Sequence, residues 1–377
     1  MKKIKTGLIG CGNISAKYLH SLTEVFSNVE VVAVSDISYE AAKKRGERFN
    51  IPHICKSNKE LLDLPEMELV VILTNPAQHY NIAEECLRAG KHTYIEKPLS
   101  LNTADGKKLV DLAKVNRLML SGAPDTILGA GVQMTRKLID DNWIGEPIAV
   151  ISHILTAGPE SWHPNPAFLY HKGAGPLFDV APYYIAGLTY LFGPVASVMC
   201  SGKKTYSQRP ITSQPLYGTM IDVEVPTYFA GILTMKNGII CSIHHSFDVL
   251  HTKWGNGIEI YGTKGVIVMP TPCDFSGEIL YRGKDDSGWN SIRPIFPYRS
   301  DNRGIGVAEM AEALFQKRAP RLGADFVYHT LDVLEQLDNS IQTNSAREVD
   351  SDFEKTQPMS LDALWGPDKT WNPADYL

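Results

Sequence analysis

A glycine-rich turn between a short apolar strand and a helix constrains this chain more than any other feature of its sequence. Residues 4–9 predict a buried strand and residues 15–22 predict a helix. The turn between them reads Gly10-Cys11-Gly12-Asn13-Ile14-Ser15. The first glycine permits a tight turn, the second lets a ligand approach the backbone, and a small third residue lets the helix pack closely. Because a helix N-terminus binds phosphate, we expect a dinucleotide to contact Gly10, Gly12, Asn13 and Ile14.

An acidic residue follows the second predicted strand, residues 29–35, in the register that this kind of site requires. Asp36 stands 21 residues beyond Ser15, where a carboxylate accepts hydrogen bonds from the ribose hydroxyls of an adenine nucleotide. Taken alone, Asp36 could also be the N-cap of a helix. A carboxylate here would repel a 2′-phosphate, and Ile37 and Ser38 supply no arginine to bind one. The sequence therefore predicts NAD in preference to NADP.

The first third of the chain alternates strands and helices. Further apolar strands are expected at residues 69–73, 92–95 and 118–121, with helices at 39–49, 80–89 and 104–116 between them. Continuous apolar strands separated by helices are typical of a parallel sheet that is buried on both faces. We therefore expect a Rossmann domain over residues 1–122, in a protein of the α/β class.

Beyond about residue 147 the pattern changes to longer, alternating strands. Residues 148–156 predict one strand, and residues 228–245 and 259–269 predict two hairpins, the first turning at 236–238. Helices are expected at residues 180–191, 307–316 and 326–341. This order predicts a C-terminal α+β domain over residues 123–350 with a large, mostly antiparallel open sheet, followed by an extended tail over 351–377. An apolar open face needs a cover, so we expect a homo-oligomer, a dimer or a tetramer formed through this sheet.

Composition excludes several classes of partner. The formal net charge of -5 argues against nucleic acid, whose binding requires a basic surface. No apolar run approaches the roughly 20 residues of a membrane helix, and no secretory leader is recognisable, so we expect no membrane partner. Six scattered cysteines form no metal-ligand spacing, so no metal site is expected. Their pattern fits a reducing compartment, and we expect a cytoplasmic protein.

Three more segments carry chemistry together with the glycine turn. They are Thr74-Asn75-Pro76-Ala77-Gln78-His79, Glu96-Lys97-Pro98 and Gly175-Pro176-Leu177-Phe178-Asp179-Val180-Ala181-Pro182-Tyr183. In this order and spacing the chain resembles the Gfo/Idh/MocA oxidoreductases, the family of glucose–fructose oxidoreductase and inositol dehydrogenase. The resemblance covers essentially the whole chain, and the stretch from Thr74 to Pro98 is its most specific part.

The resemblance assigns roles to particular residues. It implies that Lys97 projects towards the substrate hydroxyl beside the nicotinamide, with a cis bond to Pro98, and that Asp179 and Tyr183 face the same place. Many relatives carry histidine where this chain has Tyr183, and others carry tyrosine. Further cofactor contacts are expected from Thr74, Asn75, His79, Glu96 and Lys97.

These residues make chemical sense without the resemblance. Oxidising a secondary alcohol requires a base that takes the hydroxyl proton while hydride leaves. A tyrosine has a pKa near 10 in its reference state, and the Lys97 ammonium would lower the pKa of Tyr183, while Asp179 would keep Lys97 charged. Whether Tyr183 or Lys97 transfers the proton stays open. Each residue also has a plain alternative: Asp179 as a helix cap, Tyr183 as core and Lys97 as a surface lysine.

Substrate contacts are expected from the loop before this segment and from the end of the first domain. His163 and Tyr170 lie in a Gly/Pro-rich loop with aromatic neighbours, and an aromatic ring suits the apolar face of a sugar. A solvated loop histidine is the alternative for His163. Asp125 follows the strand at 118–121, where the family's cofactor and substrate meet. His329 could reach the site, but a packed helix histidine is the simpler interpretation.

The sequence thus predicts an NAD-dependent oxidoreductase acting on a sugar, cyclitol or related polyol. One alternative shares the site but is redox-neutral: transient oxidation, elimination and return of the hydride would cleave a glycoside. Another is an NAD-binding sensor without catalytic activity, against which the presence of Lys97 and Asp179 argues.

Overall fold

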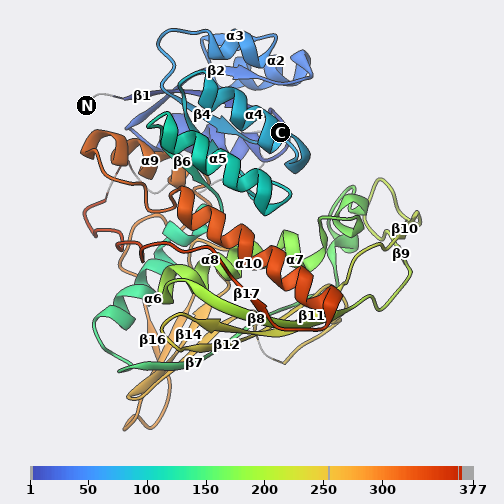
Figure 1. Ribbon diagram of the computed structural model, residues 1–377, viewed down its shortest axis with the longest axis vertical. Coiled ribbons are helices and arrows are strands. Elements are labelled where there is room, and N and C mark those ends of the chain that lie inside the picture. Colours follow the sequence, from blue (N-terminus) through green and yellow to red (C-terminus); the bar gives the residue numbers. More distant parts are fainter. Residues whose placement is uncertain (1–2, 254, 364, 367–377) are drawn as a thin grey trace.

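The N-terminal part of the chain forms a six-stranded parallel sheet (Figure 1). The computed structural model describes residues 3–253, 255–363 and 365–366. The strand order is β3-β2-β1-β4-β5-β6, so the chain reverses direction across the sheet between β1 and β4. The strands are β1 (Ile4–Ile9), β2 (Val29–Ser35), β3 (His53–Cys55), β4 (Leu69–Ile72), β5 (His92–Ile95) and β6 (Leu120–Gly122). The predicted Rossmann sheet is confirmed.

Helices connect these strands and pack against them. They are α1 (Ser15–His20), which continues as the π-helical turn η1 (Ser21–Val25), α2 (Tyr39–Arg48), α3 (Asn58–Leu62), α4 (Pro76–Arg88) and α5 (Thr103–Val115). Side chains of β4 are fully buried, as the uninterrupted apolar run predicts. Two helices from the far end of the sequence, α9 (Ile305–Gln316) and α10 (Ala324–Thr343), also contact this sheet. The C-terminal part of the chain therefore completes the packing of the N-terminal sheet.

A nine-stranded sheet dominates the rest of the molecule. Its order is β16-β15-β14-β13-β7-β12-β11-β8-β17, and its neighbours are antiparallel except for β7 and β12. The strands are β7 (Pro147–Leu155), β8 (Val195–Lys203), β11 (Tyr228–Met235), β12 (Ile240–Ser246), β13 (Gly257–Gly262), β14 (Gly265–Pro270), β15 (Ile279–Gly283), β16 (Asn290–Ile292) and β17 (Arg347–Glu348). Both predicted hairpins are present, as β11–β12 and β13–β14. The expectation of a mostly antiparallel sheet is confirmed.

One face of the large sheet is covered and the other is open. Figure 1 shows α8 (Ala181–Phe192) and α10 along one side of the sheet, where α10 contacts β8, and α6 (Ala130–Asp140) contacts β14. On the opposite face Ile151, Ile232 and Met199 share one row of the strand register and are 39%, 48% and 55% exposed. A short ribbon of β9 (Gln208–Pro210) and β10 (Met220–Asp222) projects beside the sheet (Figure 1).

The helix expected over residues 180–191 is present, and a short helix that was not expected precedes it. The structure has a short helix α7 (Gly175–Asp179) and then α8, which begins at Ala181. Pro182 lacks an N–H, and its ring would clash with the carbonyl oxygen four residues earlier, so one continuous helix cannot pass through it. The break places Asp179 at the end of α7 and Tyr183 in the first turn of α8.

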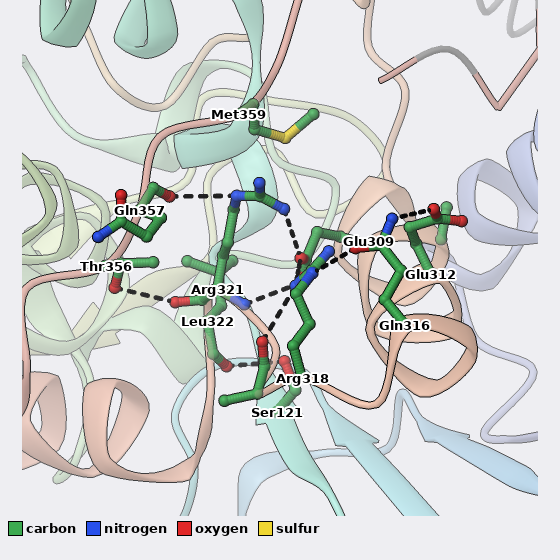
Figure 2. Close-up of polar contacts among 12 residues, drawn as sticks. Ser121, Glu309, Glu312, Gln316, Arg318, Arg321, Leu322, Thr356, Gln357 and Met359 are labelled. Carbon is green, nitrogen blue, oxygen red and sulfur yellow. Dashed lines mark hydrogen bonds and ion pairs between the residues drawn. The ribbon is translucent and has the colours of Figure 1, made fainter. Parts of the chain in front are cut away.

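The described part of the tail is anchored by a buried carboxylate. Glu309, on α9, is 1% exposed and binds Arg318 and Arg321 at 2.6 and 2.8 Å (Figure 2). Arg321 also donates to the carbonyl oxygens of Gln357 and Pro358, which fixes the tail beside α9. Residues 367–377 of the predicted tail lie outside the described residues. In the part of the chain that the structure describes, every helix is too short or too polar to cross a membrane.

Candidate active site

A groove of about 940 Å³ opens at the carboxyl ends of β1, β2 and β4. It lies at the point where the strand order reverses, which is the usual ligand site of an open parallel sheet. The lining residues from the predicted site are Gly10, Gly12, Asp36, Thr74 and Asn75. The glycine turn and the segment after β4 therefore face one cavity.

The two glycines of the turn differ in what surrounds them. Gly10 has φ +100°, and a Cβ atom there would lie 2.7 Å from the carbonyl carbon of Leu73. Gly12 has no heavy atom within 4 Å of its ideal Cβ position, so its backbone borders open space in the groove. Asn13 and Ile14 follow at the start of α1, where Ile14 is the N-cap without a side-chain hydrogen bond. The free backbone surface at Gly12 fits a bound diphosphate.

The Asp36 carboxylate binds the backbone of the glycine turn and of the segment between β2 and α2. Its Oδ2 accepts the Cys11 N–H at 2.7 Å, and its Oδ1 accepts the Ser38 N–H at 2.8 Å. Each oxygen keeps a lone pair for a ribose hydroxyl. Arg45, on α2, reaches the same turn and donates to the carbonyl oxygen of Gly12 at 3.3 Å.

The remaining predicted cofactor residues support the strand ends. His79 is fully buried, with its ring nitrogens 2.7 Å from the Pro98 carbonyl oxygen and 3.1 Å from that of Thr74. Burial lowers the pKa of His79, which favours the neutral ring. Glu96 accepts hydrogen bonds from the Tyr18 hydroxyl at 2.9 Å and from the Lys97 N–H at 2.8 Å. These two side chains hold the turn that carries Lys97.

Lys97 and Asp179 form an ion pair between the two parts of the chain. The Lys97 Nζ lies 2.9 Å from Asp179 Oδ1 and 2.8 Å from the Asp179 carbonyl oxygen. The Lys97 side chain is 18% exposed, so it is no surface lysine, and its bond to Pro98 is cis as the resemblance implies. Burial alone would lower the pKa of Lys97, but Asp179 and Tyr183 outweigh it and raise that pKa above its usual value. The N-cap of α8 is Val180, without a side-chain hydrogen bond, so Asp179 serves Lys97 rather than the helix.

Tyr183 lies between this pair and an arginine from the far end of the chain. The Lys97 Nζ is 5.5 Å from the centre of the Tyr183 ring. The Arg303 guanidinium is 5.4 Å from that centre, and its Nη1 donates to the Tyr183 hydroxyl at 3.3 Å. Burial raises the pKa of Tyr183, and the positive charges of Arg303 and Lys97 oppose this rise.

Asp125 lies behind Arg303 in the interior. It is fully buried, and its Oδ2 accepts the N–H groups of Gly304 and Gly306 at 2.7 and 3.3 Å. Burial raises the pKa of Asp125 to about 6, against the opposing effect of Arg303. The structure thus places Asp125 as a brace for the backbone after Arg303, and gives it no open surface towards a ligand.

The two residues expected from the loop occupy different environments. Tyr170 is fully buried, and its hydroxyl donates to Glu160 at 2.6 Å. His163 is half-buried, and its ring contacts Trp162 and Phe168, with centres 5.5 and 5.4 Å apart. Tyr170 therefore supports the loop from inside, and His163 stands in an aromatic group at its surface. His329 is the packed helix histidine, bonded to Val195 and Ser351.

Comparison with known families matches both parts of the chain. Residues 4–123 match the oxidoreductase family with an NAD-binding Rossmann fold, and residues 132–268 match the Gfo/Idh/MocA C-terminal domain. The chain belongs to the Gfo/Idh/MocA oxidoreductase family. It is therefore an NAD-binding oxidoreductase.

Individual relatives are distant. A myo-inositol 2-dehydrogenase of Thermotoga maritima is 22% identical over 265 residues, which cover 70% of this chain and 74% of the relative. An inositol 2-dehydrogenase/D-chiro-inositol 3-dehydrogenase of Lactiplantibacillus plantarum is 35% identical over 162 residues, 42% of this chain and 46% of the relative. The crystal structure of levoglucosan dehydrogenase with NADH and levoglucosan superposes with a TM-score of 0.79 at 20% identity, covering 93% of this chain and 100% of that chain. At this identity the structural match establishes the fold alone.

Two charged residues at the site escaped the sequence-based predictions. Arg303 precedes α9 and Arg45 lies within α2, far from the recognised motifs. The only signal for Arg303 is a charged residue beside two glycines, Gly304 and Gly306, before an apolar helix. Arg45 is one of several charged residues of α2, and nothing in the sequence distinguished it as a site residue.

The open space at Gly12 generates a test of the groove. Gly12→Val should fold normally, since its Cβ meets no neighbour, but should weaken NAD binding about tenfold or more because the side chain fills the phosphate position. Titration calorimetry with NAD measures the effect. Gly10→Val is the contrasting variant, expected to lower thermal stability through its contact with Leu73. Unchanged NAD affinity in Gly12→Val would show that the groove is not the cofactor site.

Proposed function

We propose that this protein transfers hydride between NAD(H) and a secondary alcohol or ketone of a sugar, cyclitol or related polyol. The observation that carries the proposal is the Lys97–Asp179 ion pair, whose ammonium lies 5.5 Å from the centre of the Tyr183 ring. Lys97 follows β5, the neighbour of β4 in the sheet, and the segment after β4 lines the groove. Relatives named as inositol and levoglucosan dehydrogenases support a polyhydroxylated substrate. An ammonium and a phenol suit a ligand whose oxygens both accept and donate hydrogen bonds.

Each residue has a distinct part in this proposal. Lys97 and Tyr183 contact the reacting oxygen, and Asp179 holds the Lys97 ammonium in place and charged. Oxidation moves the alcohol proton to one of these groups, and reduction returns it. Asp125 and Tyr170 act from the interior, as supports of the backbone. His163 stays a prediction as a contact to the substrate's apolar face.

The groove residues fit a dinucleotide. Gly10 and Gly12 would border its diphosphate, Asp36 would bind the adenine ribose, and Thr74 and Asn75 would line its path towards Lys97. When bound, the nicotinamide supplies the acceptor or donor of hydride. His79 and Glu96 hold the backbone that brings these residues together.

The central test is turnover on a panel of sugars, cyclitols and their keto forms, followed by absorbance of the reduced nicotinamide. Wild-type protein should turn over one class of polyol. Lys97→Met should lower the rate on the order of 100-fold or more, because the ammonium that binds the reacting oxygen is lost. Lys108→Met, which removes an exposed lysine of α5, is the matched control and should keep the wild-type rate.

Other outcomes of this panel separate the alternatives. Consumption of a glycoside without net NADH would indicate the redox-neutral cleavage. Cofactor binding with no conversion of any panel member would contradict the proposal and favour the NAD-binding sensor.

A preference for NAD over NADP is the second part of the proposal. The Asp36 carboxylate lies between the glycine turn and the start of α2, where a 2′-phosphate would meet its charge. Wild-type protein should bind NAD about tenfold or more tightly than NADP, and Asp36→Asn should reduce this difference, because it removes the charge and keeps the shape. Arg45, which is near the same turn, would then favour the 2′-phosphate. Titration calorimetry with both cofactors measures this, with the exposed Asp63→Asn as control. Equal affinities in the wild type would contradict the preference.

The open face of the large sheet supports the third part, a homo-oligomer. Ile151, Ile232 and Met199 are exposed apolar residues of one register row, in which Ser242 lies between Ile151 and Ile232, and a second copy would cover them. Light scattering should give the mass of a dimer or tetramer at micromolar concentration. Ile232→Lys should dissociate it, because a lysine would be buried in the interface, whereas Val115→Lys on the exposed end of α5 should not. A monomeric wild type would refute the proposal.

A further inference from the structure

We propose that Arg303 is a positioning residue that makes Tyr183 the proton-transfer group of the site and leaves Lys97 as a permanently charged hydrogen-bond donor. This inference rests on the proposed function and adds to it the identity of the acid/base. It depends on the hydrogen-bond geometry of three side chains, Tyr183, Lys97 and Arg303.

The Tyr183 hydroxyl has a donor neighbour and, among the described residues, no acceptor. Its hydrogen bond comes from Arg303 Nη1 at 3.3 Å. A guanidinium has N–H donors and no acceptor, so the phenol oxygen must accept this bond and its own proton must point elsewhere. That proton is free for a substrate oxygen. When the proton leaves, the phenolate keeps the bond from Arg303, which then becomes charge-assisted on both sides.

The Lys97 ammonium, unlike the Tyr183 hydroxyl, already donates hydrogen bonds to acceptors of the protein. An ammonium has three N–H donors, and Asp179 accepts two of them, through Oδ1 at 2.9 Å and its carbonyl oxygen at 2.8 Å. One N–H remains for the substrate oxygen. Loss of a proton would leave the Asp179 carboxylate without a counter-charge in a site where Lys97 is 18% exposed. Lys97 therefore binds the reacting oxygen as a cation and does not collect its proton.

The positive charge of Arg303 is only partly balanced by the carboxylates near it. Its closest carboxylate approaches are 3.8 Å from Nη1 to Asp125 and 3.6 Å from Nε to Asp301, both longer than a hydrogen bond. Its Nε is buried without a hydrogen-bond partner, and so is Asp125 Oδ1. Asp125 instead fixes the backbone immediately after Arg303, through Gly304 and Gly306. The guanidinium is thus placed by its backbone, and its shortest directional contact is to Tyr183.

The proton step follows from these contacts. In oxidation the alcohol O–H bond breaks and its proton goes to the Tyr183 oxygen, while the C–H electron pair and its hydrogen leave as hydride and a C=O bond forms. In reduction the Tyr183 proton goes to the alkoxide oxygen. Arg303 and Lys97 stabilise the phenolate in both directions, since both cations lie within 5.5 Å of the ring centre.

Titration of the Tyr183 phenol tests the inference without a known substrate. The phenolate absorbance of wild-type protein minus that of Tyr183→Phe, followed across alkaline pH, gives the midpoint of this one side chain. In Arg303→Gln, compared with its own Tyr183→Phe double variant, the midpoint should rise by about one pH unit or more, because a cation that stabilises the phenolate is gone. Arg303→Lys keeps a charge without the planar fork, so its midpoint should lie between the two. Where turnover is found, the pH profile of kcat/KM should shift in the same order.

Controls separate this role from a structural one. Arg318→Gln removes a partly exposed arginine from Glu309, which Arg321 still binds, and should leave the Tyr183 midpoint unchanged (Figure 2). An unchanged midpoint in Arg303→Gln would overturn the inference even if the panel finds a substrate. A raised midpoint without turnover of any panel member would count against the proposed function and still support the coupling of Arg303 to Tyr183. If Arg303→Gln does not fold, the Lys variant decides: a midpoint equal to that of the wild type overturns the inference.

Discussion

The ion pair between Lys97 and Asp179 is the contact on which the site depends. Lys97 ends the turn after β5 of the parallel sheet, and Asp179 ends α7 beside the large sheet, so the pair joins the two halves of the molecule. Both charges are largely shielded from water, and each needs the other because an unpaired buried charge costs several kcal/mol. The pair is a contact between the two sheet-bearing halves, and the Tyr183 ring lies within 5.5 Å of the ammonium.

Carboxylates around this pair act mainly on the backbone. Asp36 holds the glycine turn, Glu96 holds the Lys97 N–H, and Asp125 holds the segment after Arg303. A carboxylate that accepts backbone N–H groups fixes loops that the sheets alone would leave free. The site residues thus lie on loops, as is common, and charge-assisted hydrogen bonds hold these loops in place. Asp125 was expected to contact a ligand, but its carboxylate instead accepts hydrogen bonds from the backbone of Gly304 and Gly306.

The sequence predicted the parts whose signals are local. The glycine turn, Asp36 and the strand β4 follow from spacing and apolar runs, and both hairpins of the large sheet follow from alternation and turn residues. The short helix α7 before Val180 was not expected, whereas the helix expected from residue 180 is present as α8, with Pro182 in its first turn. Arg303 was missed for a different reason. Its contact with Tyr183 spans 120 residues, and no periodicity in either segment encodes such a pairing.

The charge balance of the site bears on the proposed role of Tyr183. A histidine gains or loses its proton near neutral pH, whereas a phenol near apolar groups holds its proton more tightly. The Asp179 carboxylate balances the positive charge of Lys97, so Lys97 alone stabilises a Tyr183 phenolate only weakly. Arg303 is less completely paired, with its two carboxylates at 3.6 and 3.8 Å, and its bond to the hydroxyl is direct. In the proposed role of Tyr183, Arg303 of the segment before α9 is therefore the second cation that stabilises the phenolate.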